Sequence, residues 1–84
     1  MSSYADRIAR MRGRAVELAR SGNYKSWVEI ERSLIAEGFL EARVEFNSPS
    51  SRSRVDEVCR IAQGALARGV TYDQAMNESR GGKG

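Results

Sequence analysis

The segment "NSPSSRSRV", residues 47–55, places hydroxyl and guanidinium groups at the expected start of a helix. The first turn of a helix has free backbone amides and a positive dipole end, which disfavours cations by about 0.3–1 kcal/mol. Arg52 and Arg54 nevertheless lie there, beside the hydroxyls of Ser51 and Ser53. Free amides, hydroxyls and forked cations together bind phosphate. The segment therefore predicts a contact with phosphate, such as that of a nucleic-acid backbone.

These arginines also have an alternative partner inside the chain. Arg52, Asp56 and Arg60 follow one another at intervals of four residues, so on a helix Asp56 can pair with both arginines. This hypothesis leaves Arg54 without a partner. The sequence alone does not decide between phosphate and the internal carboxylate.

A second group of cations lies near the N-terminus. Arg7, Arg10 and Arg14 share one narrow stripe of the first expected helix, beside its apolar face. Segment 1–25 holds six cations and two carboxylates, whereas segment 26–47 holds two cations and five carboxylates. The stripe therefore predicts either contacts with a nucleic-acid backbone or ion pairs with the acidic segment.

The residues that most enzymes need are missing. The chain has no histidine, the usual general base near neutral pH, and one cysteine, Cys59. A single cysteine forms neither an internal disulfide nor a cysteine-based zinc site. The glutamates are expected to form a solvated helix face rather than a catalytic pair. We therefore expect no enzyme, no metal and no cofactor.

The length and composition indicate one small domain. Its 84 residues give a thin core, which leaves a homodimer open, and the formal net charge is +3. The N-terminal residues lack the apolar stretch of a signal peptide, and no apolar run approaches the ~20 residues that span a bilayer. We therefore expect a cytoplasmic protein without a membrane segment.

Apolar spacing predicts an all-α fold with three main helices and a short C-terminal one. The expected ranges are 3–20, 26–37, 51–68 and 71–79. We expect residues 1–79 to form a single helical domain and residues 80–84 to form a flexible tail.

Cap residues mark the ends of these helices. Ser3 with Asp6 and Ser26 with Glu29 have the spacing of capping boxes, in which the acidic side chain returns to the amide of the serine. Gly38 is expected to end the second helix in the left-handed conformation. Gly69 is expected to end the third, and Thr71 to cap the fourth.

Residues 40–46, "LEARVEF", have two competing periodicities. Strict alternation of apolar and charged residues is typical of a half-buried strand, whereas Glu, Ala and Arg favour a helix. With no second strand in the chain, a strand here would have to pair with its twin in a dimer. A strand, a short helix and an irregular segment all stay open. The predicted interface residues are Trp27, Leu40, Val44 and Phe46.

The segment "SWVEIERSLIAEGF", residues 26–39, resembles the front of a helix-turn-helix domain. Its pattern S-W-x-x-I-x-x-x-L-x-x-x-G-F is similar to patterns in small helix-turn-helix regulators and in the C-terminal parts of serine recombinases. The resemblance covers about 14 of the 84 residues and implies DNA binding. Directly after the turn comes "LEARVEF", whose glutamates suit phosphate poorly, so the helix after residue 50 is the expected reader of DNA. "LEARVEF" followed by a helix also resembles a ribbon-helix-helix dimer, the lower-ranked alternative.

Two functions follow as hypotheses. The first is a small basic, helix-turn-helix-like DNA-binding protein with an accessory role or a role in transcription regulation. Its expected DNA contacts are Arg52, Arg54, Ser51, Ser53, Arg7, Arg10 and Arg14. The alternative is a protein-interaction or self-assembling adaptor, dimeric through residues 40–46 or bound to an acidic protein.

Overall fold

The structure is a computed structural model that describes residues 3–80, and these residues form an all-α fold, as predicted. No strand occurs in this range. The helices are α1 (Tyr4–Arg20), α2 (Trp27–Ala36), α3 (Ala42–Glu45), α4 (Pro49–Arg68) and α5 (Tyr72–Arg80).

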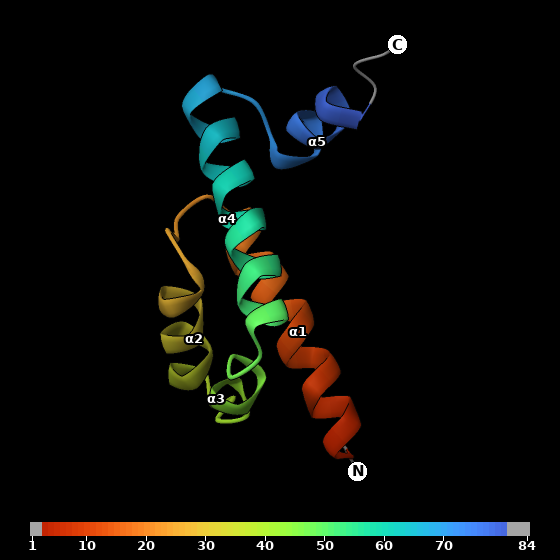
Figure 1. The fold of residues 1–84 in the computed structure, drawn as a ribbon, viewed down its shortest axis with the longest axis vertical. Helices are drawn as coiled ribbons and strands as arrows, with labels where there is room; N and C mark the ends of the chain where they lie inside the picture. The colour runs from red at the N-terminus through yellow and green to blue at the C-terminus, as the bar shows by residue number, and fades with distance from the viewer. Residues whose placement is uncertain (1–2, 81–84) are drawn as a thin grey trace.

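Helices α1, α2 and α4 run along the long axis of a molecule that measures 44 × 23 × 22 Å (Figure 1). Helices α1 and α4 run in the same direction, and α2 runs back beside them. The short helix α3 joins α2 to α4 at one end, and α5 lies near the other end of α4. The N-terminal half of α1 is thereby placed close to α3 and to the start of α4.

The core lies where α1, α2 and α4 meet, and α3 closes one end of it. Its largest fully buried side chains are Phe46, Met11, Ile30, Leu34 and Cys59. The ring of Trp27 stacks on that of Phe46, with 5.7 Å between their centroids. Such aromatic pairs contribute roughly 0.5–1.5 kcal/mol beyond the area that they bury.

Side-chain caps begin two helices as predicted. In α1, the Asp6 amide donates to the hydroxyl of Ser3, and the Ser3 amide donates to the Asp6 carboxylate. Before α5, the Gln74 amide donates to the Thr71 hydroxyl, and the Gln74 side-chain oxygen accepts from the Thr71 amide. Both pairs satisfy amides that a helix leaves free at its N-terminus.

The cap of α2 differs in one contact from the prediction. Ser26 is the N-cap, and its hydroxyl accepts from the Val28 amide. The Glu29 carboxylate reaches one residue further back than expected and accepts from the amide of Lys25 at 2.8 Å. Both bonds still satisfy backbone donors at the start of the helix.

Gly38 ends α2 in the left-handed conformation, with φ of 102°. The Phe39 amide donates to the Leu34 carbonyl at 2.9 Å, and the Gly38 amide donates to the Ile35 carbonyl at 3.0 Å. These two bonds form a Schellman motif, as the "EGF" sequence predicts. Gly69 ends α4 with φ of 77°.

Residues 40–46 form helical turns around α3, so the strand alternative is wrong. The Glu45 amide donates to the Glu41 carbonyl and the Phe46 amide to the Ala42 carbonyl, each at 3.0 Å. Ala42 and Phe46, four residues apart, are both buried, while Val44 between them is exposed. A strand would place Leu40 and Val44 on the same face as Ala42 and Phe46, but Leu40 and Val44 are exposed, so the burial fits a helix and not a strand.

The third main helix, α4, begins two residues earlier than predicted. Ser48 is its N-cap, with its hydroxyl accepting from the Ser51 amide, and Pro49 occupies the first turn. Proline suits this position because its missing amide would have had no partner there. Ser51 and Ser53 therefore lie within the helix.

Arg80, which the prediction placed in a tail of residues 80–84, is the last residue of α5. Residues 81–84 lie outside the described range. Among the described helices, none is both long enough and apolar enough to cross a membrane.

Candidate functional site

One flank of α1 is held to the segment between α2 and α3 by ion pairs. Arg7 forms two hydrogen bonds with Glu41, at 2.5 and 3.1 Å, and a third with the Gly38 carbonyl. Arg14 bonds to Glu37 at 2.9 Å. The hydrogen bonds from these arginines lower the pKa values of Glu41 and Glu37 below their ordinary range. Two of the three predicted stripe arginines thus have internal partners, as the charge layout allowed.

Arg10, the third member of the stripe, is exposed and forms no ion pair with the described side chains. The opposite flank of α1 is bound through Arg12, which was not among the predicted site residues. Arg12 bonds to both carboxylate oxygens of Glu45, at 3.0 and 3.2 Å. The hydroxyl of Ser51 in α4 donates to the same carboxylate at 2.9 Å. This bridge of Arg12, Glu45 and Ser51 links α1, α3 and α4.

Arg52 stabilises the junction of α3 and α4. Its Nε donates to the Phe46 carbonyl at 2.6 Å, and its guanidinium lies 4.6 Å from the centroid of the Trp27 ring. The carboxylate of Asp56 accepts from the Trp27 amide at 2.7 Å. Among the described residues, Arg60 pairs with Glu57. The hypothesis that Asp56 bridges Arg52 and Arg60 is therefore wrong, because Asp56 caps α2 instead.

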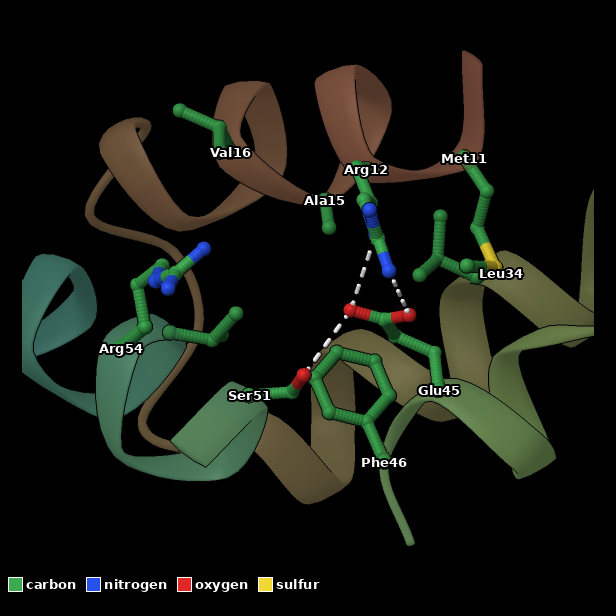
Figure 2. A pocket seen from close by; sticks show the side chains of 10 residues that line it. Met11, Arg12, Ala15, Val16, Leu34, Glu45, Phe46, Ser51 and Arg54 are labelled. Atoms are coloured by element: carbon green, nitrogen blue, oxygen red, sulfur yellow. Dashed lines mark hydrogen bonds and ion pairs between the residues drawn. The ribbon is translucent and has the colours of Figure 1, made fainter. Parts of the chain in front are cut away.

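Arg54 has a different setting from Arg52. It is exposed and forms no salt bridge with the described side chains. Figure 2 shows its guanidinium reaching from α4 toward α1. Its positive charge is close enough to Glu45 to contribute to the lowered pKa of that carboxyl. Ser53 is exposed on the same turn.

The predicted interface residues separate into buried and exposed members. Phe46 is 2% exposed and belongs to the core, so it presents almost no surface to a partner in this structure. Trp27 is half-buried between Phe46 and Arg52. Leu40 and Val44 are each 63% exposed, and they lie one helical turn apart.

Two adjoining hollows lie between α1 and the junction of α3 with α4. The wider one, of about 330 Å³, has Tyr4, Ile8 and Val44 as its apolar walls. The narrower one, of about 70 Å³, has Arg54 at its edge and an apolar lining. That lining consists of Met11, Ala15, Val16, Leu34, Phe46 and Val55.

Arg12, Glu45 and Ser51 line both hollows, and Figure 2 shows their bridge in the narrower one. We call the two hollows together the α1 groove. It follows α1 from Tyr4 to Val16, which at 1.5 Å per residue is a length of roughly 18 Å. Apolar walls thus flank a polar crossing near the middle of the groove.

The carboxylate of Glu45, in the polar crossing of the groove, stays ionised at neutral pH. Burial is the largest influence on Glu45 and acts to raise its pKa, but several nearby donors and cations oppose it. Hydrogen bonds from Arg12 and Ser51, with the charges of Arg12 and Arg54, together lower the pKa of Glu45 below its ordinary value. The groove therefore contains two cations and one anion from these residues.

Sequence reasoning missed Arg12, Tyr4 and Ile8 as groove residues. Arg12 follows Ile8 by four residues, so helical spacing places the two side by side. That spacing marks Arg12 as a neighbour of the apolar stripe on the flank opposite Arg7. What lies across from it depends on the turn at Gly38, and helical spacing within α1 does not contain that information.

The comparisons with known proteins gave no support for a helix-turn-helix family. Neither protein-family models, nor curated proteins, nor solved structures gave a match to this chain. The function of this chain is therefore inferred from the arrangement of its own residues.

Proposed function

We propose that this protein is a protein-interaction module that binds a segment of its partner in the α1 groove. The observation that carries the proposal is the pair of adjoining hollows with apolar walls. Exposed apolar patches beside a polar rim mark interaction sites in soluble proteins. Tyr4, Leu40 and Val44, each 63% exposed, adjoin or line this region.

The ion pairs favour this proposal over binding to phosphate. Arg7, Arg12 and Arg14 are each hydrogen-bonded to a glutamate, and Arg52 is bonded to a backbone carbonyl. Nucleic-acid affinity comes largely from many cations that neutralise phosphates. A partner nucleic acid would have to compete with these internal carboxylates.

Binding of DNA is the second candidate function. It is favoured by Arg54 and Ser53, which are both exposed at the start of α4. In this proposal Arg54 contacts phosphate beside Ser53, as in a helix-turn-helix-like accessory protein, and Arg10 adds a further cation. This second candidate requires that a few exposed arginines suffice to bind a DNA duplex.

The test of the leading proposal uses peptides as the probe. A phage library of random 12-residue peptides is selected on the wild-type protein, and the affinity of an enriched peptide is measured by calorimetry. Val44→Asp, in the groove wall, should weaken binding by about tenfold or more, because burial of a valine contributes roughly 1.5 kcal/mol.

Val28→Asp is the matched control, since Val28 is an exposed valine on α2 that does not line the groove. It should leave the affinity unchanged. Failure to select any peptide, or equal affinity for the wild type and Val44→Asp, would refute the proposal. Circular dichroism of both variants verifies that they are folded.

A further inference from the structure

The α1 groove has an excess of positive charge, and Arg54 supplies it. The groove contains Arg12, Arg54 and Glu45, which sum to a charge of +1. The carboxylate of Glu45 already accepts hydrogen bonds from Arg12 and Ser51. The guanidinium of Arg54 forms no salt bridge with the described side chains and points toward α1 (Figure 2).

We propose that the partner segment carries a carboxylate side chain that binds Arg54, and an apolar side chain that packs against the apolar walls of the wider hollow. This inference rests on the proposed function and names the chemistry of the partner. An arginine binds a carboxylate through two parallel hydrogen bonds. The apolar side chains of Val16 and Val55 line the same hollow, and such a pairing is stronger beside apolar groups than in open solvent.

The size of the narrower hollow fits such a group. One water needs roughly 10–15 Å³ of this kind of space, so about 70 Å³ admits a group of roughly five to seven non-hydrogen atoms. An aspartate or glutamate side chain has four or five non-hydrogen atoms and therefore fits. The larger indole side chain of tryptophan does not.

The spacing of the two hollows sets the spacing of the two partner residues. Ile8 lines the wider hollow and Ala15 the narrower one, and seven residues of α1 extend roughly 10 Å. An extended peptide covers this distance in about three residues, at ~3.3 Å each. A helical peptide covers it in about seven. Side chains of an extended peptide face the same side only at even intervals, and the shortest even interval that covers this distance is four residues. The apolar and acidic residues should therefore be spaced i, i+4 in an extended partner or i, i+7 in a helical one.

The groove suits a peptide better than a nucleic acid. Its walls are apolar on both sides of the crossing, and the ionised carboxylate of Glu45 repels phosphate. A peptide segment can place an apolar side chain against Tyr4, Ile8 and Val44 and one acidic group at Arg54. A duplex presents a charge at every phosphate and no apolar side chain.

The experiment compares Arg54→Ala with Arg32→Ala, using peptides selected from the 12-residue library. Arg32 is an exposed arginine on α2 outside the groove, so its loss controls for net charge. We expect selected peptides to be enriched in Asp or Glu at one of the two spacings. Arg54→Ala should lower the affinity for these peptides about tenfold, whereas Arg32→Ala should leave it unchanged. Replacement of the acidic residue of the peptide by its amide should lower the affinity for the wild-type protein but not for the Arg54→Ala variant.

The outcomes separate this inference from the proposed function. Peptides that depend on Val44 but show no acidic enrichment and no response to Arg54→Ala would overturn the inference alone. Peptides without any dependence on Val44 would overturn both. Salt-sensitive binding of a DNA duplex that Arg54→Ala abolishes would overturn the assignment of Arg54 to a peptide. A homodimer that dissociates in the Arg54→Ala variant would overturn the assignment of the groove to a separate partner protein.

Discussion

Arg52 and Arg54 lie two residues apart on α4 and have different roles in this structure. Arg52 contacts the Trp27 ring and the Phe46 carbonyl, so it supports the packing of α2, α3 and α4. Arg54 is exposed at the edge of the α1 groove. Two residues correspond to about 200° around a helix, which explains the different surroundings.

The stability of the two alanine variants should therefore differ. Arg52→Ala should lower the free energy of unfolding by about 1–2 kcal/mol, through loss of a cation–π contact and a charged hydrogen bond. Arg54→Ala should change it by less than about 0.5 kcal/mol. Urea unfolding followed by the fluorescence of Trp27, the only tryptophan, measures both.

Both variants remove one cation from the first two turns of α4, so the change in net charge is the same for the pair. Equal changes in stability would contradict the structural role of Arg52. The sequence could not separate the two arginines, because their partners come from residues 27 and 46 of other elements. It did identify the segment as unusual, since two cations at a helix start need a reason.

At the scale of elements, local signals predicted most helix ends. Serine, threonine and glycine caps act within a few residues, and so they can be read from the sequence. Residues 40–46 could not be assigned, because both periodicities were present. The structure selected the interval of four through burial of Ala42 and Phe46, which depends on the rest of the core.

Two glycines test the role of backbone conformation. Gly38→Ala should destabilise the protein by about 1–2 kcal/mol, because φ at this position is 102° and an added Cβ meets no side chain that could compensate. Gly64→Ala, within α4 and with open space around it, should stabilise the protein by about 0.5–1 kcal/mol.

Thermal unfolding followed by circular dichroism measures these opposite signs. A change of 1 kcal/mol should shift the midpoint by roughly 4–8 °C in a domain of this size. A stabilising effect of Gly38→Ala would show that the left-handed turn between α2 and α3 is absent. The groove depends on that turn, because it directs α3 toward the N-terminal half of α1.

At the scale of the whole molecule, arginines of α1 join segments that are distant in sequence. Arg7, Arg12 and Arg14 bind glutamates 23 to 34 residues away. The charge layout predicted the attraction between the two segments. It could not predict the pairing, because the register depends on how α2 turns back along α1.

Stability should fall in acid. The pKa values of Glu37, Glu41 and Glu45 are lowered in the folded state, so the unfolded chain binds more protons as the pH falls. The stabilisation is present above the ordinary glutamate pKa of 4.5 and is lost as the pH falls through the lower folded values. Urea unfolding between pH 7 and pH 3 measures this decline.

Glu41→Gln should make the decline shallower, because it removes one of the three linked carboxyls. Glu31→Gln is the control, since Glu31 forms no salt bridge with the described side chains. A wild-type stability that stays constant from pH 5 to pH 3 would contradict the ion pairs of α1.

The central claim is that a partner peptide occupies the α1 groove, and amide NMR tests it most directly. A peptide selected on the wild-type protein is titrated into the ¹⁵N-labelled chain. We expect the largest shift changes in residues 4–16 of α1 and in residues 44–55, because these two ranges contribute to both hollows. Changes confined to α5 or to the outer face of α2 would contradict it.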